Sequence, residues 1–376
     1  IIHADGQSEL YIHSDKVGDD VRAHLGNRVS IRNEDDLPDG LANLGGKTVW
    51  VDPSLSSAFM FETLKTAGAK IHAAMDPIML PKAKKNAAEI AGTTVAHIRD
   101  GAALTRFLHW LATEAQSGKY DEIQAAQKLE SLRSELPGLK DLSFESISGA
   151  GPNGAHCHYR VNTDSNLRLE KGSLYLIDSG GQYQDGTTDV TRTVAIGTPT
   201  DEMKKHFTLV LKGHIALAAI RFPKGTSGHA LDALARMALW NHGLDYDHGT
   251  GHGVGVYLGV HEGPQRIAKA PNAVALAPGM IVSNEPGFYK TGGYGIRIEN
   301  LQYVHEPRDI EGGERPMLGF ENLTFAPIDR ELIDVAMLSN EERDWVNSYH
   351  GQVMDKIGPQ VKGEVWAWLE QVCAAV

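Results

Sequence analysis

Four carboxylates in apolar surroundings are the residues of this sequence best suited to chemistry. Asp178 and Glu285 end the apolar stretches SLYLID and GMIVSNE, and Asp189 and Glu299 occur in the segments that follow them. A buried carboxylate is costly unless another group compensates its charge, and several carboxylates close together raise one another's pKa. A pair of divalent cations would cancel these four charges, so the pattern predicts a dinuclear metal site.

A glycine-rich segment at 248–264, HGTGHGVGVYLGVHEGP, supplies histidines for such a site. Its histidines are His248, His252 and His261. Because glycine lets the backbone approach a ligand closely, we predict that His252 reaches the carboxylates as a fifth ligand. Oxygen ligands with one imidazole suit Mn²⁺, Co²⁺ or Fe²⁺, and Zn²⁺ is also compatible with them. Two such ions about 3.5–4 Å apart hold a hydroxide and stabilise a tetrahedral oxyanion, which is the chemistry of amide hydrolysis.

Strands are expected to carry these acids, because their neighbours are largely apolar and β-branched. The expected strands are 173–180, 188–196, 279–287 and 295–304. The chain reverses around the turn Asp185–Gly186, so Asp178 and Asp189 can approach each other, although the register stays open. Helices are expected over 120–136, 201–220 and 228–243.

An internal similarity links the two regions that bear the acids. KGSLYLIDSG and PGMIVSNEPG both read Gly, five residues, an acid, one residue, Gly, and each precedes a second strand with another acid. This repeated layout predicts a duplicated half-domain.

The pattern of elements predicts two domains. Residues 1–82 read as a small α/β unit, with short strands alternating with helices. Residues 83–376 form the larger domain. A capping-box pattern of Asn86 and Glu89 predicts the start of its first helix. A helical extension is expected over 330–376.

Charge and composition exclude several partners. The net charge is −12 without a basic run, which argues against nucleic acid or an anionic membrane as partner. No apolar run is long enough to span a membrane. The only cysteines, Cys157 and Cys373, lie far apart, which favours a reducing compartment, and we expect a cytoplasmic protein. The chain begins with Ile1 and shows no signal peptide, so we expect a piece of a longer chain.

The acids and His252 resemble, in order and spacing, the metal ligands of the pita-bread metallopeptidases, family M24. The segments YQDGTTDVTRT, HGTGHGVGVYLGVHEGP and GIRIEN are most similar to the cytosolic type of aminopeptidase P, the Xaa-Pro aminopeptidases. The resemblance covers essentially the whole chain. It implies an α/β (α+β) pita-bread catalytic domain, with duplicated half-domains around a curved, mostly antiparallel sheet. Part of a smaller, non-catalytic creatinase-like α/β domain would precede it, and the chain would be N-terminally incomplete.

The resemblance also implies roles for the five ligands. Asp178 would bind one metal ion, and Asp189 and Glu299 would bridge both. His252 and Glu285 would bind the second ion, and the catalytic Glu285 would also take the proton of the attacking water. The family reaction is attack of a metal-bound hydroxide on the Xaa–Pro bond, with Mn²⁺ as the expected ion and Zn²⁺ or Co²⁺ as alternatives.

Five further residues are implied to contact the substrate, a peptide with proline in second position. His158 and His261 would act in catalysis by stabilising charge, and together with His248 they would face the substrate. Tyr289 and Arg297 would line the proline side of the cleft. Each histidine could instead orient a metal ligand without touching the substrate. A homodimer is implied by the resemblance alone.

Several alternatives stay open. A prolidase would run the same chemistry on Xaa-Pro dipeptides only, and a member of this fold without activity would bind peptides but not cleave them. Creatinase-like relatives lack metal ligands, whereas all five are present here. A third alternative is an inactive fragment that needs the missing N-terminal part.

Two residues near the predicted site are expected to be structural. Strand alternation would turn Cys157 away from the face of His158. The same rule turns Arg192 away from Asp189, which favours a structural ion pair for its guanidinium.

Overall fold

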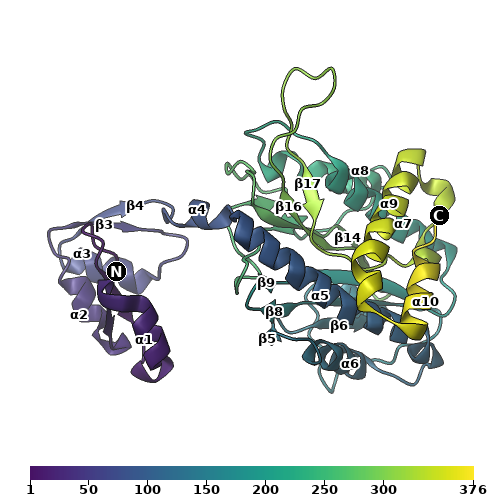
Figure 1. Ribbon diagram of the computed structural model, residues 1–376, viewed down its shortest axis with the longest axis horizontal. Coiled ribbons are helices and arrows are strands. Elements are labelled where there is room, and N and C mark those ends of the chain that lie inside the picture. Colours follow the sequence, from purple (N-terminus) through teal and green to yellow (C-terminus); the bar gives the residue numbers. More distant parts are fainter. The chain divides into compact units, whose positions relative to one another are not determined.

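The computed structural model describes residues 1–376, and the chain forms two compact units, 1–79 and 80–376 (Figure 1). No helix in it is both long enough and apolar enough to cross a membrane.

The first unit is a small α/β structure, as predicted. Two pairs of parallel strands form it: β1 (Ser8–Tyr11) with β2 (Val29–Arg32), and β3 (Thr48–Val51) with β4 (Lys70–Ala73). Parallel neighbours need a crossover, which α1 (Asp19–Leu25) and α3 (Ala58–Thr66) provide, and α2 (Leu37–Ala42) packs on α3. The buried core is Leu41, Leu44, Val51 and Leu64.

The second unit opens with helices. After the short α4 (Met79–Ala83), α5 (Ala87–Ala112) begins at the predicted capping box, in which Asn86 and Glu89 bond each other's backbone N–H groups. Next come α6 (Glu122–Ser134) and η5, a short 3-10 helix (Gly151–Ala155).

The first acid-bearing region forms a three-stranded antiparallel sheet. Its strands are β6 (Ile147–Ala150), β7 (Ser173–Ser179) and β10 (Val190–Ile196), with β7 in the centre. Asp178 on β7 lies opposite Thr191 on β10, so Asp189, just before β10, comes close to Asp178. The predicted Asp185–Gly186 turn belongs to an inserted hairpin of β8 (Gly181–Tyr183) and β9 (Gly186–Thr187), which pairs with β5 (Leu139–Leu142).

The second acid-bearing region forms the corresponding sheet. β13 (Ile281–Asn284), β16 (Asn300–Val304) and β17 (Phe320–Asn322) are antiparallel. The single strand predicted over 295–304 is wrong: β15 (Tyr294–Arg297) pairs with β14 (Gly287–Lys290), and the chain then changes partners at Glu299. The Glu299 N–H donates to the carbonyl of Thr191 at 3.1 Å, which links the second region to β10.

Helices cover both sheets. α7 (Asp201–Ala219) packs on α8 (Asp232–Trp240) and on strands of the second region, while α6 packs on β6 of the first. The predicted C-terminal extension ends in α9 (Asn340–Ile357) and α10 (Gly363–Val372), which lie beside α5 (Figure 1). Two antiparallel three-stranded sheets, each with its own helices, agree with the predicted duplication.

Candidate metal centre

One cavity of 510 Å³ in the second unit gathers the predicted ligands. All five line it: Asp178, Asp189, His252, Glu285 and Glu299. They come from β7, the start of β10, the short strand β11 (Gly251–His252), the end of β13 and the break between β15 and β16. Segments that lie far apart in sequence therefore meet at one point.

His252 lies between carboxylates from the two sheets. Its Nε2 is 3.4 Å from Asp189 Oδ2 and 3.4 Å from Glu285 Oε1. Ligand atoms of Asp189, His252 and Glu299 all lie within 4.8 Å of one another. Because His252 Nδ1 donates to the Gly253 carbonyl at 3.0 Å, Nε2 is the ring nitrogen that faces the acids.

Glycines on both sides of His252 are required by close backbone contacts. A Cβ on Gly251 would lie 2.0 Å from the carbonyl oxygen of Ser283, and one on Gly253 would lie 1.9 Å from that of Glu262. The glycines predicted to permit a close approach do so here by letting β11 lie against β13 and against the segment after His261.

Two hydroxyl groups that were not predicted from the sequence as site residues orient the acids. Thr191 Oγ1 donates to Glu299 Oε2 at 2.8 Å. Ser283 Oγ donates to Glu285 Oε1 at 3.1 Å and accepts the backbone N–H of His252 at 2.9 Å. The sequence did contain a signal for both residues: Thr191 lies two positions after Asp189, and Ser283 lies two positions before Glu285. Residues two positions apart in a strand lie on the same face of the sheet.

The acids are poorly compensated within the protein. Burial raises the pKa of Asp189, Glu285 and Glu299, and neighbouring carboxylates add to the rise. Arg297 is the one cation bonded to them, through Nη2 to Asp178 Oδ2 at 2.7 Å, while Asp178 Oδ1 is buried without a partner. Oxygen donors with one imidazole, an orphaned oxygen and excess negative charge fit divalent cations.

The three histidines that were predicted to face the substrate, His158, His248 and His261, all line the cavity. The His261 ring stands edge-on to that of His252, with centroids 4.2 Å apart, and burial lowers its pKa. His158 is exposed, and its ring contacts the Cys157 thiol, with Nδ1 3.7 Å from Sγ. Burial, helped by Arg297, lowers the pKa of His248 to about 3, so this imidazole is neutral.

Tyr289 does not line the cavity, in contrast to its predicted place on the proline side. It lies behind two residues that do: its hydroxyl accepts from Arg297 Nη1 at 2.6 Å and lies 2.8 Å from His248 Nε2. His248 Nδ1 bonds the Gly249 carbonyl at 2.8 Å, so Nε2 accepts the Tyr289 hydroxyl hydrogen. Tyr289 therefore holds Arg297 and His248 in place, and His248 Nε2 is already engaged.

The expectation for Cys157 is wrong. Residues 156–158 form a turn after η5 and not a strand, so alternation does not apply, and Cys157 lines the cavity together with His158. The sequence Gly151-Pro152-Asn153-Gly154 is rich in turn residues and could have given the signal. Both cysteines are free.

Arg192 is structural, but it forms no ion pair. Its guanidinium is buried and donates only to neutral oxygens. These acceptors are the carbonyls of Thr191, Glu299, Ala326 and Pro327, the side-chain oxygen of Asn300 and the hydroxyl of Tyr349. Arg192 thus ties β10 to the backbone of the Glu299 segment and to α9.

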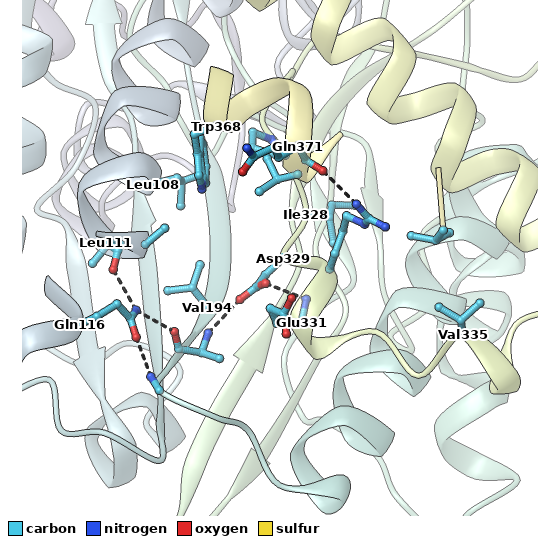
Figure 2. A pocket seen from close by; sticks show the side chains of 17 residues that line it. Leu108, Leu111, Gln116, Val194, Ile328, Asp329, Glu331, Val335, Trp368 and Gln371 are labelled. Atoms are coloured by element: carbon cyan, nitrogen blue, oxygen red, sulfur yellow. Dashed lines mark hydrogen bonds between the residues drawn. The ribbon is translucent and has the colours of Figure 1, made fainter. Parts of the chain in front are cut away.

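A second cavity of 530 Å³ lies elsewhere in the unit and contains none of the predicted site residues. Figure 2 shows its walls, which come from α5, the end of β10, the segment 327–331 and α10. Asp329 accepts the backbone N–H groups of Ala195 and Glu331 at 2.9 and 3.0 Å, and Gln116 bonds the backbone at Leu111, Ala195 and Gly197. These groups serve the fold, so the first cavity is the candidate site.

Known proteins resemble the chain along its whole length. The profile of metallopeptidase family M24 matches residues 91–306, that of the C-terminal region of peptidase M24 matches 316–376, and that of the creatinase/prolidase N-terminal domain matches 1–89. A probable Xaa-Pro aminopeptidase P of Laccaria bicolor is 50% identical over 79% of this chain and 47% of its own. One of Tuber melanosporum is 46% identical over 92% of this chain and 59% of its own.

A solved structure gives the same result for the fold. The X-prolyl aminopeptidase of Caenorhabditis elegans, described as a cytosolic enzyme with a di-nuclear active site, superposes with a TM-score of 0.91 at 37% identity. The match covers 98% of this chain and 62% of the nematode chain. The chain thus spans about half to three fifths of the length of these relatives.

Proposed function

Because the chain belongs to metallopeptidase family M24, we propose that it is the catalytic part of an aminopeptidase that cleaves the Xaa–Pro bond at the N-terminus of peptides. One observation carries the proposal: four carboxylates and an imidazole from separate segments converge on one cavity, in which Arg297 is the one guanidinium bonded to one of these acids. The relatives described above from Laccaria bicolor, Tuber melanosporum and Caenorhabditis elegans are named for this activity, which supports the proposal.

The five converging residues would hold two divalent ions, for which we propose Mn²⁺, with Zn²⁺ or Co²⁺ as alternatives. When bound, the ions supply an activated water and neutralise negative charge. Asp178 would hold one ion, His252 and Glu285 would hold the other, and Asp189 and Glu299 would be shared by both. The 3.4 Å distances from His252 Nε2 to Asp189 and Glu285, and the closeness of Asp189, His252 and Glu299, support this assignment.

Glu285 is proposed as the residue that moves the proton. Burial raises the pKa of its carboxyl, which favours taking a proton from the attacking water and passing it to the proline nitrogen. Ser283 holds one of its oxygens, Oε1. His158 and His261 face the same space and would donate hydrogen bonds to the substrate carbonyl as negative charge develops on its oxygen.

Proline recognition would rest on shape. An Xaa–Pro amide has no N–H, so a site cannot identify it by accepting that hydrogen. The cavity wall includes the apolar side chains of Phe144, Ile147 and Val260 beside the polar cluster, and we assign the ring to this wall. Arg297 would border it, with Tyr289 as its support.

Domain organisation, assembly and location complete the proposal. We assign residues 1–82 to part of a non-catalytic domain and 83–376 to the catalytic domain, in a homodimer in the cytoplasm. Two free cysteines and the cytosolic nematode relative support the location. Light scattering of the purified chain tests the dimer, since a monomer at micromolar concentration would contradict it.

The test compares peptides in the presence of added Mn²⁺. We expect hydrolysis of Ala-Pro-Phe to Ala and Pro-Phe, no cleavage of Ala-Ala-Phe, and loss of activity with chelator. Elemental analysis should give two ions per chain, and fewer in Asp189→Ala. Cleavage of Ala-Pro but not Ala-Pro-Phe would make the protein a prolidase. Binding of Ala-Pro-Phe without cleavage by the metal-loaded chain would make it a peptide-binding member of the fold.

A further inference from the structure

Glu122, at the start of α6, is a fully buried carboxylate whose bonds all go to neutral donors. Its exposure is 0%, and burial raises its pKa. Oε1 accepts the Ala150 N–H at 2.7 Å, and Oε2 accepts the Leu167 N–H at 2.9 Å. Asn153 Nδ2 donates to both oxygens at 3.0 and 3.1 Å, and the Tyr159 hydroxyl donates to Oε2 at 3.0 Å.

These donors all belong to one segment, residues 150–167, which we call the His158 loop. Ala150 and Leu167 are its two ends, and Asn153 and Tyr159 flank His158. Asn153 Nδ2 also lies 2.8 Å from the Tyr159 hydroxyl oxygen and 2.8 Å from the Ser165 carbonyl oxygen, so this amide links separate parts of the loop. One carboxylate therefore closes the loop at its ends and holds it on both sides of His158.

The loop delivers three side chains to the metal cavity: Cys157, His158 and Arg160. The imidazole of His158 is exposed, and its neighbour Cys157 is its hydrogen-bond contact within the protein. Its position is therefore set by the loop backbone. A residue that holds the backbone of the His158 loop therefore also sets the position of the His158 imidazole in the cavity.

A role for Glu122 in the helix itself does not explain these bonds. Asp121 is the N-cap of α6, and it forms a capping box with Gln124 at 2.9 and 3.1 Å. The helix start is thus complete without the Glu122 side chain, which turns to the loop. An uncompensated buried carboxylate is costly, and here neutral donors on the loop offset the cost.

We propose that Glu122 is a positioning residue that places His158 at the substrate by holding the His158 loop through its carboxylate. The inference rests on the proposed substrate role of His158 and extends it to a residue outside the cavity. Replacing the carboxylate by an amide puts an N–H₂ group against donors, so the loop loses at least one anchor while the packing volume is kept.

The experiment is a double-mutant cycle with Glu122→Gln and His158→Ala on the metal-loaded chain. We expect Glu122→Gln to lower kcat/KM for Ala-Pro-Phe about tenfold or more, with unchanged metal content. In the His158→Ala background the same change should alter kcat/KM less than about twofold, because the residue to be positioned is gone. Asp121→Ala, which uncaps the same helix, is the matched control and should keep most activity.

Amide hydrogen exchange gives a readout that does not depend on activity. Glu122→Gln should speed exchange within 150–167 while leaving α6 and the metal-site strands protected. Asp121→Ala should speed exchange only in the first turn of α6 and leave both 150–167 and the metal-site strands protected. Equal losses of kcat/KM in both backgrounds, or unchanged exchange in the loop, would overturn the proposal. If His158→Ala keeps wild-type activity, the substrate role of His158 fails, and exchange still decides whether Glu122 holds the loop.

Discussion

Arg297 Nη2 donates to Asp178 Oδ2 at 2.7 Å, although 119 residues separate the two in the chain. Both side chains are buried. The same guanidinium donates from Nε to Thr191 Oγ1 at 3.0 Å and from Nη1 to the Tyr289 hydroxyl. A single cation thus ties a carboxylate of the first sheet to an aromatic residue of the β14–β15 hairpin, at the wall of the cavity.

Arg297→Met removes this cation while keeping an unbranched apolar chain. Breaking a buried pair leaves an uncompensated charge and costs about 3–5 kcal/mol, so the midpoint of urea unfolding should fall clearly in chelator. Activity should fall on the order of a hundredfold, since Arg297 borders the substrate. Lys290→Met, which breaks an exposed pair with Glu202, is the control with little expected effect. Unchanged unfolding of Arg297→Met would contradict the pairing.

Asp189→Asn should stabilise the metal-free protein and abolish its metal site. The pKa of Asp189 is raised by burial and by neighbouring carboxylates, so its negative charge is unfavourable without cations. We expect a higher urea midpoint than wild type at pH 7.5 in chelator, and a lower one in Mn²⁺. Because the folded state holds the proton above the ordinary pKa, the wild-type penalty grows as pH rises, and the advantage of the variant should shrink toward pH 5. Asp185→Asn, outside the cavity and paired with Arg99, should keep its metal content.

His350→Gln tests the pH dependence of stability at a buried histidine of α9 that does not line the metal cavity. Burial lowers the pKa of His350 to about 4, and its Nε2 accepts the Ile328 N–H at 3.1 Å, so the imidazole is neutral. The unfolded chain takes up this proton below about 6.5, so stability from this residue is present above that pH and is lost as pH falls toward 4. Glutamine can accept the same N–H without titrating. Urea midpoints should therefore fall less between pH 7 and 5 in the variant, and equal falls would refute the assignment.

Arg192→Lys tests the buried guanidinium that joins β10 to the Glu299 segment and α9. Lysine has three donors and no planar fork, so it cannot reach all six acceptors. We expect a loss of about 3 kcal/mol in unfolding free energy and weaker Mn²⁺ binding, because the backbone of Glu299 loses a donor. Calorimetric titration with Mn²⁺ measures the second effect. Wild-type affinity would show that Arg192 supports only the fold.

The chemistry of the site could be read from the sequence, because its signals are local. The apolar neighbours of an acid at the end of a strand indicate that the acid is buried. The glycines on both sides of His252 indicate that another segment lies close to this backbone, even though the sequence does not say which segment. Hydrophobic periodicity and capping motifs predicted most of the helices and strands, including the start of α5 at Asn86. These patterns depend on neighbours within a few residues.

The tertiary structure decided what depends on partners from distant segments. The break at Glu299 follows from a hydrogen bond to Thr191 in the other sheet, and no local pattern marks it. Cys157 faces the cavity because a turn replaces the assumed strand, and Tyr289 supports Arg297 from behind because of how β14 pairs with β15. The sequence marks Glu122 only as a polar residue of the helix expected over 120–136. The groups that donate hydrogen bonds to its carboxylate lie 28 to 45 residues away in the chain. The sequence determined which groups carry charge and which are buried, and the pairing of strands from distant segments determined which of them meet.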